Sequence, residues 1–180
     1  PLGLYGYGRV SGVVAGYARA FGMPVHVWGS EEARTRAQSD GLFVPESREA
    51  FFGGCDVISL HVKLTPQTRG IITSVDLAQM RPGSVLVNTS RSGLVAPGAL
   101  LDGLTAGRPG MAALDVFDTE PLTNPADPLM SHPNVICTPH IGFVTEDELD
   151  MQFGDIYDQI NAYTAGAPIH LANPEVKPKT

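Results

Sequence analysis

Several features are scarce in this chain of 180 residues, and each scarcity excludes a class of protein. Lysine and arginine number 12 against 19 acidic residues, so the net charge of −7 argues against nucleic acid or an anionic membrane as a partner. The sequence has no stretch long and apolar enough to span a bilayer, and no signal peptide is visible. A hydrophobic content of 43% with 17% charged residues is instead typical of one globular domain with a sizeable core.

Cysteine and histidine are also few. The two cysteines, Cys55 and Cys137, lie in apolar runs without disulfide spacing, which indicates reduced and buried thiols. The five histidines are scattered, so we expect no metal site. We expect a cytoplasmic protein.

Strand-like and helix-like segments alternate along the chain. We expect strands at Leu2–Tyr5, Val25–Trp28, Leu42–Val44, Val57–Leu60, Val85–Val87, Ala112–Val116 and Val135–Cys137. Helices are expected from Val10 to Gly22, at Glu31–Ser39, at Ser47–Phe52, from Thr73 to Met80, from Pro97 to Gly107, and from Thr145 to Gly166. This alternation predicts an α/β fold, a doubly wound (Rossmann) parallel sheet with helices on both faces.

The glycine turn after the first strand is the first functional signal. Gly6, Gly8 and Ser11 occupy the three positions of G-x-G-x-x-G, with Ser11 in place of the third glycine. The first glycine permits the tight turn, and the second lets the backbone approach a pyrophosphate. The helix that follows points its free N–H groups at that anion. The candidate cofactor-binding residues here are Gly6, Tyr7, Gly8, Arg9 and Val10.

The end of the second strand leaves the coenzyme open. An acidic residue that holds the adenosine ribose is expected there, but the sequence has Gly29. Glu31 or Glu32 could replace it from slightly further on, which favours NAD. Alternatively, Ser30 and Arg34 could receive a 2′-phosphate, which favours NADP. NAD is the preferred interpretation, with Gly29 and Ser30 as cofactor-binding candidates.

Three side chains suited to acid-base chemistry follow later strands. Arg91 lies in NTSR, Glu120 in DVFDTEP and His140 in TPHIG, each after a short apolar run. Because the carboxyl ends of parallel strands meet at one edge of a sheet, we expect these side chains beside the glycine turn. Together they polarise a carbonyl and deliver a proton to it. A cofactor turn with such a set predicts hydride transfer. The span 117–133 is proline-rich and without periodicity, which is typical of a functional loop.

Several segments resemble a known family. GYGRVSG, LHVKLTPQTRGII, LVNTSRSGLV, AALDVFDTEPL and CTPHIG are similar, in order, to signatures of the NAD-dependent D-isomer-specific 2-hydroxyacid dehydrogenases. The resemblance extends from Leu2 to about Val176. It implies an oxidoreductase that exchanges hydride between NAD(P) and the CH–OH group of a small D-2-hydroxy acid or its 2-oxo counterpart. It also implies a homodimer formed through the cofactor domains.

The resemblance assigns roles to the candidate catalytic residues. Arg91 binds the substrate carboxylate and carbonyl, and His140 is the acid-base residue. Glu120 pairs with that imidazole, favouring its charged form and fixing its orientation. The resemblance also extends to the cofactor site, where Asp115 lies near the nicotinamide carboxamide. The remaining cofactor candidates are Asn88, Thr89 and Ser90 towards the nicotinamide, His61 and Val62 towards the adenosine, and Thr68.

The predicted domain organisation follows from the same resemblance. We expect residues 1–172 to form a dinucleotide-binding domain and residues 173–180 to be a frayed tail. The chain begins at Pro1, almost inside a strand, so we expect a piece of a longer protein. The substrate-binding domain, which the family builds mainly from residues before the glycine turn, is expected to be absent from this chain. We therefore expect the piece alone to be inactive.

Three departures from the family and two other functions stay open. Ser11 replaces a glycine, Gly29 replaces an acidic residue, and Lys63 stands where the family commonly has proline. A non-catalytic, dinucleotide-sensing binding module of the corepressor type is one alternative, which the Arg91–Glu120–His140 set disfavours. A formate-type dehydrogenase is another, but it is expected to have glutamine in place of Glu120.

Overall fold

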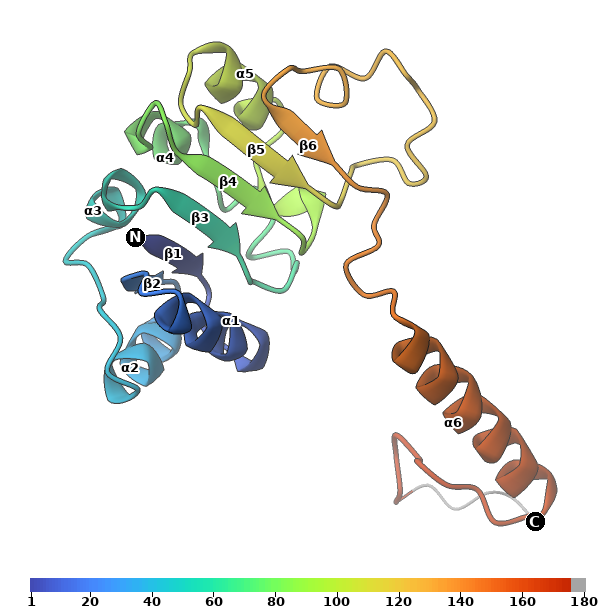
Figure 1. The fold of residues 1–180 in the computed structure, drawn as a ribbon. Coiled ribbons are helices and arrows are strands. Elements are labelled where there is room, and N and C mark those ends of the chain that lie inside the picture. The colour runs from blue at the N-terminus through green and yellow to red at the C-terminus, as the bar shows by residue number, and fades with distance from the viewer. Residues whose placement is uncertain (176–180) are drawn as a thin grey trace. The chain divides into compact units, whose positions relative to one another are not determined.

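Six short strands form one parallel sheet in the computed structural model, which describes residues 1–175 (Figure 1). The strands are β1 (Leu2–Tyr5), β2 (Val25–Trp28), β3 (Val57–Leu60), β4 (Val85–Asn88), β5 (Met111–Leu114) and β6 (Val135–Cys137). They lie in the order β2-β1-β3-β4-β5-β6, and every adjacent pair is parallel. All strands therefore end at the same edge of the sheet.

Helices cover both faces of this sheet (Figure 1). On one face α1 (Arg9–Ala20) and α2 (Glu31–Ser39) pack alanines against the strands. On the other face lie α3 (Arg48–Gly54), α4 (Ser74–Gln79) and α5 (Ala99–Thr105), with a single 3₁₀ turn, η1, at Ser92–Leu94. Phe51 and Phe52 are fully buried in this second cluster. The predicted doubly wound parallel sheet is confirmed.

Side-chain caps explain where several helices begin. The hydroxyl oxygens of Ser30, Ser47 and Thr73 accept hydrogen bonds from backbone N–H groups three residues later, at the starts of α2, α3 and α4. At α4 the Asp76 carboxylate also accepts a bond from the Thr73 N–H at 2.7 Å, which completes a capping box. These helices start where the sequence predicted them.

Three predicted boundaries were wrong. Leu42–Val44 forms no strand ladder, because only Phe43 makes an isolated bridge, to His26. The segment is bounded by Gly41, which has a left-handed backbone (φ +69°), and by Pro45. The helix expected from Pro97 begins at Ala99, because Gly98 has a left-handed backbone (φ +76°) that no regular helix contains. The strand β5 ends at Leu114, so Asp115 and Val116 lie beyond it.

The chain divides into two compact units, of which the first is Pro1–His140 and the second begins at Ile141. The second unit contains α6 (Glu146–Thr164), which the Thr145 hydroxyl caps by accepting a bond from the Glu148 N–H at 3.1 Å. None of its residues is buried. Within residues 1–175 no helix is long and apolar enough to cross a membrane. Of the predicted tail 173–180, residues 176–180 lie outside the described part of the chain.

The sheet order creates a crevice between β1 and β3. The chain leaves β1 through α1 towards β2 on one side, whereas β3 lies on the other side of β1. At such a reversal the connections diverge and leave a crevice beyond the carboxyl ends of the strands. Backbone hydrogen bonding between β1 and β3 continues to the ends of these strands, where the His61 N–H donates to the Tyr5 carbonyl oxygen at 2.8 Å.

Candidate active site

The glycine turn lies at this crevice, and its first two glycines are required for different reasons. Gly6 has φ +99°, and a Cβ there would lie 2.7 Å from Val62 Cγ2 and 2.8 Å from the His61 carbonyl oxygen. Only glycine fits that position. A Cβ at Gly8 would meet no protein atom within 4 Å, so packing does not require glycine at Gly8. The turn therefore keeps open space beside Gly8, as a ligand that approaches the backbone needs.

Ser11 fits the third glycine position by turning inward. Its side chain is buried, with 1% of the residue exposed. Its Oγ accepts a hydrogen bond from the Gly8 N–H at 2.7 Å and donates one to the Gly8 carbonyl oxygen at 3.2 Å. Serine thus closes the turn from inside. The first N–H groups of α1 have no acceptor within the helix, which suits them to an anion.

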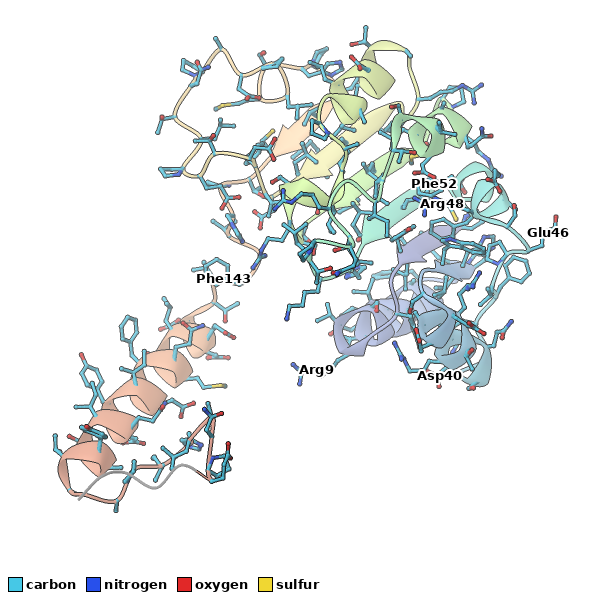
Figure 2. The ribbon with its side chains drawn as sticks, turned by 180° about the vertical axis from the view of Figure 1, so that it is seen from behind. Arg9, Asp40, Glu46, Arg48, Phe52 and Phe143 are labelled. Atoms are coloured by element: carbon cyan, nitrogen blue, oxygen red, sulfur yellow. The ribbon has the colours of Figure 1, made fainter. Side chains whose placement is uncertain are left out.

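A groove of about 390 Å³ runs from this turn along the ends of β3 and β4. Arg9 stands at its side and extends away from the start of α1 (Figure 2). The residues that line the groove are Gly8, Arg9, Val10, Ser11, Leu60, His61, Val62, Lys63, Thr89, Ser90 and Arg91. They include three cationic side chains and no carboxylate, although the chain as a whole is acidic. The groove therefore fits a diphosphate-bearing cofactor.

Two predicted cofactor residues, Tyr7 and Thr68, use their side chains in hydrogen bonds within the protein. The Tyr7 hydroxyl donates to Asp40 Oδ2 at 2.8 Å, in a partly buried bond to the C-cap of α2. The Thr68 hydroxyl donates to the Lys63 carbonyl oxygen at 2.7 Å and accepts from the Thr65 N–H at 2.8 Å. Thr68 thus stabilises the loop that carries Lys63.

The flank of the groove beyond β2 combines arginines and acids. Gly29 has φ +152° and provides no side chain. The Arg34 guanidinium lies 4.7 Å from the centre of the Trp28 ring, and Arg36 donates to the Tyr7 carbonyl oxygen at 2.6 Å. The Glu32 carboxylate accepts hydrogen bonds from the Glu32 backbone N–H and from the Ser30 side chain at the start of α2. These bonds hold the pKa of Glu32 below its usual value. A charged carboxylate therefore stays beside Ser30.

Asn88 presents Arg91 at the edge of the sheet. Asn88 is buried at the end of β4, where its Nδ2 donates to the Arg91 carbonyl oxygen at 2.9 Å and its Oδ1 accepts from the Ser90 N–H at 3.1 Å. The Ser90 hydroxyl donates to the Val62 carbonyl oxygen at 2.9 Å, which joins this loop to the end of β3. Arg91 itself is exposed. The buried Asn88 side chain therefore stabilises the loop that carries Arg91.

His140 and Glu120 come together beyond β6. His140 Nδ1 lies 2.6 Å from Glu120 Oε2, and Glu120 Oε1 accepts from the Phe117 N–H at 2.9 Å. The bond to His140 is the main cause that lowers the pKa of Glu120, and the charge of Arg91 acts in the same direction. The long loop after β5 thus brings a carboxylate to the imidazole. In that pairing the Nδ1 atom of the imidazole faces the Glu120 carboxylate.

An apolar pocket of about 300 Å³ adjoins this pair. Its walls are Phe117, Pro121, Leu122, Met130, Cys137 and Pro139, with Glu120, Thr138 and His140 at its polar side. The pair itself is open to solvent, with 29% of the His140 side chain and 35% of the Glu120 side chain exposed. Within residues 1–175 no group of three histidine, cysteine, aspartate or glutamate side chains could hold a metal ion.

Asp115 lies directly after β5 and is buried, with 3% exposed. Its N–H donates to the Asn88 carbonyl oxygen at 3.0 Å, and its Oδ1 accepts from the Thr138 hydroxyl at 2.5 Å. The predicted residues Asn88, Asp115 and His140 therefore belong to neighbouring strand ends. Thr138 was not among the predicted site residues, although it lies inside CTPHIG, directly before Pro139 and His140.

Comparison with known proteins agrees with this site. Residues 1–142 match the family model described as D-isomer specific 2-hydroxyacid dehydrogenase, NAD binding domain. The chain belongs to this family. Its NAD-binding domain is the part that these residues represent, and the predicted family and cofactor class are confirmed.

Individual members of the family match over nearly the whole chain. D-3-phosphoglycerate dehydrogenase of Bacillus subtilis is 36% identical over 174 residues, which are 95% of this chain and 32% of the relative. A solved structure of a D-3-phosphoglycerate dehydrogenase from Ralstonia solanacearum, described as putative, has 47% identity and a TM-score of 0.91 over 96% of this chain and 50% of its own. An NADPH-dependent glyoxylate/hydroxypyruvate reductase from Sinorhizobium meliloti has 28% identity and a TM-score of 0.75, covering 91% and 64%. The chain thus spans about a third to two thirds of the family members it matches.

Proposed function

We propose that these residues serve as the NAD-binding domain of an oxidoreductase that exchanges hydride between NAD(P)H and a small D-2-hydroxy or 2-oxo acid. The observation that carries the proposal is the Glu120–His140 pair, joined at 2.6 Å at the same sheet edge as the glycine turn. An acid-base pair beside a nucleotide groove is the minimum that carbonyl reduction needs.

The cofactor binds in the groove along β1, β3 and β4. Gly6, Gly8 and the start of α1 hold the diphosphate, supported by Arg9 and Lys63 from the sides. Thr89 and Ser90 lie along the nicotinamide half, His61 and Val62 along the adenosine half. Asp115 lies near the nicotinamide carboxamide. When bound, NAD(P)H supplies the hydride.

The chain's own residues hold the substrate and move the proton. Arg91 binds the substrate carboxylate, because a guanidinium offers two parallel donors to two oxygens. His140 gives a proton from Nε2 to the carbonyl oxygen during reduction and accepts it back during oxidation. Glu120 holds Nδ1, so that the ring keeps its orientation and its positive charge is offset.

The coenzyme is NAD, with NADP as the alternative. Glu31 and Glu32 in the first turn of α2 disfavour a 2′-phosphate, whereas Gly29 leaves no carboxylate at the position that usually excludes it. The NADPH dependence of the Sinorhizobium meliloti enzyme supports keeping NADP in the assay. The substrate is a small 2-oxo acid, in line with the glyoxylate and hydroxypyruvate in that enzyme's name.

The protein is a cytoplasmic homodimer in this proposal. Apolar side chains on α1 and directly after it support a self-association face: Val10, Val13 and Tyr17 of the helix and Phe21 at its C-cap are 53–84% exposed. The reduced state of Cys55 and Cys137, both free thiols, supports a reducing compartment. Sedimentation of the full-length protein tests the dimer, and cell fractionation tests the location.

The proposed activity is tested on the full-length protein. NADH and NADPH oxidation is measured with glyoxylate, hydroxypyruvate, pyruvate and bulkier 2-oxo acids. Wild type should reduce at least one of them, and His140→Ala should lower turnover by orders of magnitude while NADH binding persists. Residues 1–180 alone should turn over nothing, because a substrate-binding domain is needed to close the cleft. Equal turnover by His140→Ala and wild type would remove His140 from its role.

A further inference from the structure

Thr138 makes three hydrogen bonds at the end of β6, and each goes to a different part of the site. Its N–H donates to the Leu114 carbonyl oxygen at 2.9 Å, which extends the pairing of β5 with β6. Its hydroxyl donates to Asp115 Oδ1 at 2.5 Å. Its carbonyl oxygen accepts from the His140 N–H at 3.0 Å. Thr138 therefore stands between the buried carboxylate of Asp115 and the backbone of His140.

These bonds complete a closed circuit around the imidazole. From Asp115 the chain runs two residues to Phe117, whose N–H donates to Glu120 Oε1 at 2.9 Å. Glu120 Oε2 lies 2.6 Å from His140 Nδ1. From His140 the circuit returns through the Thr138 carbonyl oxygen and the Thr138 hydroxyl to Asp115. Glu120 thus holds the His140 ring, and Thr138 holds the His140 backbone.

The backbone of His140 needs such support. His140 has φ +55°, in the left-handed region that residues other than glycine rarely adopt. A conformation of this kind persists when its surroundings fix it. The bond from the His140 N–H to Thr138 closes a tight turn over Pro139, and the Thr138 hydroxyl ties that turn to Asp115.

We propose that Thr138 is a positioning residue for the acid-base histidine: its hydroxyl fixes the distance between the Asp115 carboxylate and the His140 imidazole. The inference rests on the proposed function, in which Asp115 lies beside the nicotinamide and His140 protonates the carbonyl. Hydride and proton must reach adjacent atoms of one substrate, so the two side chains need a constant separation. Thr138 is itself exposed, so packing gives its side chain little reason to be threonine.

The test compares variants that differ in one atom or group of Thr138. Thr138→Val keeps the shape and removes the hydroxyl, whereas Thr138→Ser keeps the hydroxyl and removes the methyl group. In the full-length enzyme, Thr138→Val should lower kcat roughly 10- to 100-fold, with KM for the 2-oxo acid and Kd for NADH nearly unchanged. Thr138→Ser should restore kcat to within about threefold of wild type. Thr123→Val, at an exposed threonine outside the circuit, is the matched control and should behave as wild type.

A second readout does not depend on turnover. The ring ¹⁵N chemical shifts of His140 report its bond to Glu120, and they should change in Thr138→Val but not in Thr138→Ser or Thr123→Val. If Thr138→Val does not fold, the same comparison is made with Thr138→Ala, which also removes the hydroxyl that donates to Asp115.

The outcomes separate the two proposals. If wild type reduces none of the 2-oxo acids but the His140 shifts respond to loss of the hydroxyl, the proposed function fails and the positioning of His140 by Thr138 stands. If wild type is active and Thr138→Val matches it in kcat and in ring shifts, the positioning role is overturned alone. A Thr138→Ser variant as impaired as Thr138→Val overturns it as well, because the hydroxyl would then not be the group that matters.

Discussion

The Ser11 hydroxyl accepts a hydrogen bond from the N–H of Gly8 at 2.7 Å, inside the turn that faces the cofactor groove. A third glycine would normally let α1 pack closely on β1. Serine is compatible with that packing because its side chain is small and points inward. Its hydroxyl occupies the position where glycine has only a hydrogen atom, and it bonds to Gly8 of the turn. Ser11 therefore departs from the glycine pattern but stabilises the same turn through a hydrogen bond to Gly8.

Ser11→Gly should keep NADH affinity within about threefold of wild type, because glycine is the residue that this turn usually carries. Ser11→Leu should lower the free energy of unfolding by about 1–3 kcal/mol, since a larger side chain at a buried position overpacks the contact of α1 with β1. Chemical denaturation and NADH fluorescence titration check both. A Ser11→Leu variant as stable as wild type would mean that the position is not tightly packed.

Gly6→Ala should lower the stability of the fold, whereas Gly8→Ala should lower the affinity for NADH. At Gly6 the added Cβ meets Val62 and the His61 backbone in a left-handed conformation, so the free energy of unfolding should fall by about 1–3 kcal/mol. At Gly8 the Cβ meets no protein atom, so stability should change little while NADH affinity falls about 10-fold. Denaturation curves and NADH titration of the two variants distinguish steric loss from ligand loss. Equal NADH binding by Gly8→Ala and wild type would place the cofactor elsewhere.

Glu120→Gln should lower kcat of the full-length enzyme at least about 10-fold, with NADH binding unchanged. Glutamine still bonds to His140 Nδ1, but it no longer offsets the positive charge of the imidazolium. Steady-state kinetics with the best 2-oxo acid checks the effect, and Glu46→Gln, at an exposed acid on another part of the domain, is the control (Figure 2). Full activity of Glu120→Gln would show that only the bond, and not the charge, matters.

The pair Arg48–Asp76 predicts a pH dependence of stability. Arg48 packs against Phe52, with its guanidinium 5.6 Å from the ring centre, and its Nη2 donates to Asp76 Oδ2 at 2.8 Å (Figure 2). Burial alone would raise the pKa of Asp76, but the bonds from Arg48 and Thr73 outweigh it and lower that pKa. A carboxyl whose pKa is lower in the folded state than in the unfolded state stabilises the fold at pH values above its unfolded pKa, which is about 3.9. This contribution to stability is lost as the pH falls through the folded pKa.

Asp76→Asn should therefore cost about 2–3 kcal/mol of unfolding free energy near neutral pH. The gap between variant and wild type should begin to narrow below about pH 4, where Asp76 of the unfolded chain takes up a proton, and should close only when the pH falls below the lowered pKa of folded Asp76. Urea denaturation at several pH values measures the gap. A constant difference across that range would contradict the assignment of Asp76 as the titrating group.

The acids beside Gly29 should influence the choice of coenzyme. Replacing both Glu31 and Glu32 by glutamine removes two negative charges from the first turn of α2, next to Ser30. NADPH affinity should rise about 3- to 10-fold, while NADH affinity changes less, because only NADPH carries the 2′-phosphate. Titration with both coenzymes checks the ratio. An unchanged ratio would mean that this turn does not face the adenosine ribose.

Local sequence patterns determined most of the sheet and helices. Five of the six strands, β1, β2, β3, β4 and β6, coincide with apolar runs to within a residue, and α2 has the predicted bounds Glu31–Ser39, where Ser30 caps it. The apolar runs and the helix cap are patterns within a few residues, which a single sequence displays, although the strands themselves pair with distant segments. The short segment at Leu42–Val44 did not become a strand, because its pairing depends on a distant neighbour and only Phe43 finds one.

The order of the signatures along the chain was enough to identify the family and to nominate Arg91, Glu120 and His140. What only the tertiary structure decided is how those groups are held. The Glu120 carboxylate reaches His140 across a proline-rich loop without periodicity, Ser11 turns inward rather than towards the cofactor, and Thr138 joins Asp115 to His140. Each of these depends on side-chain direction at the ends of neighbouring strands, and direction is set by packing between residues far apart in sequence, which no local pattern records.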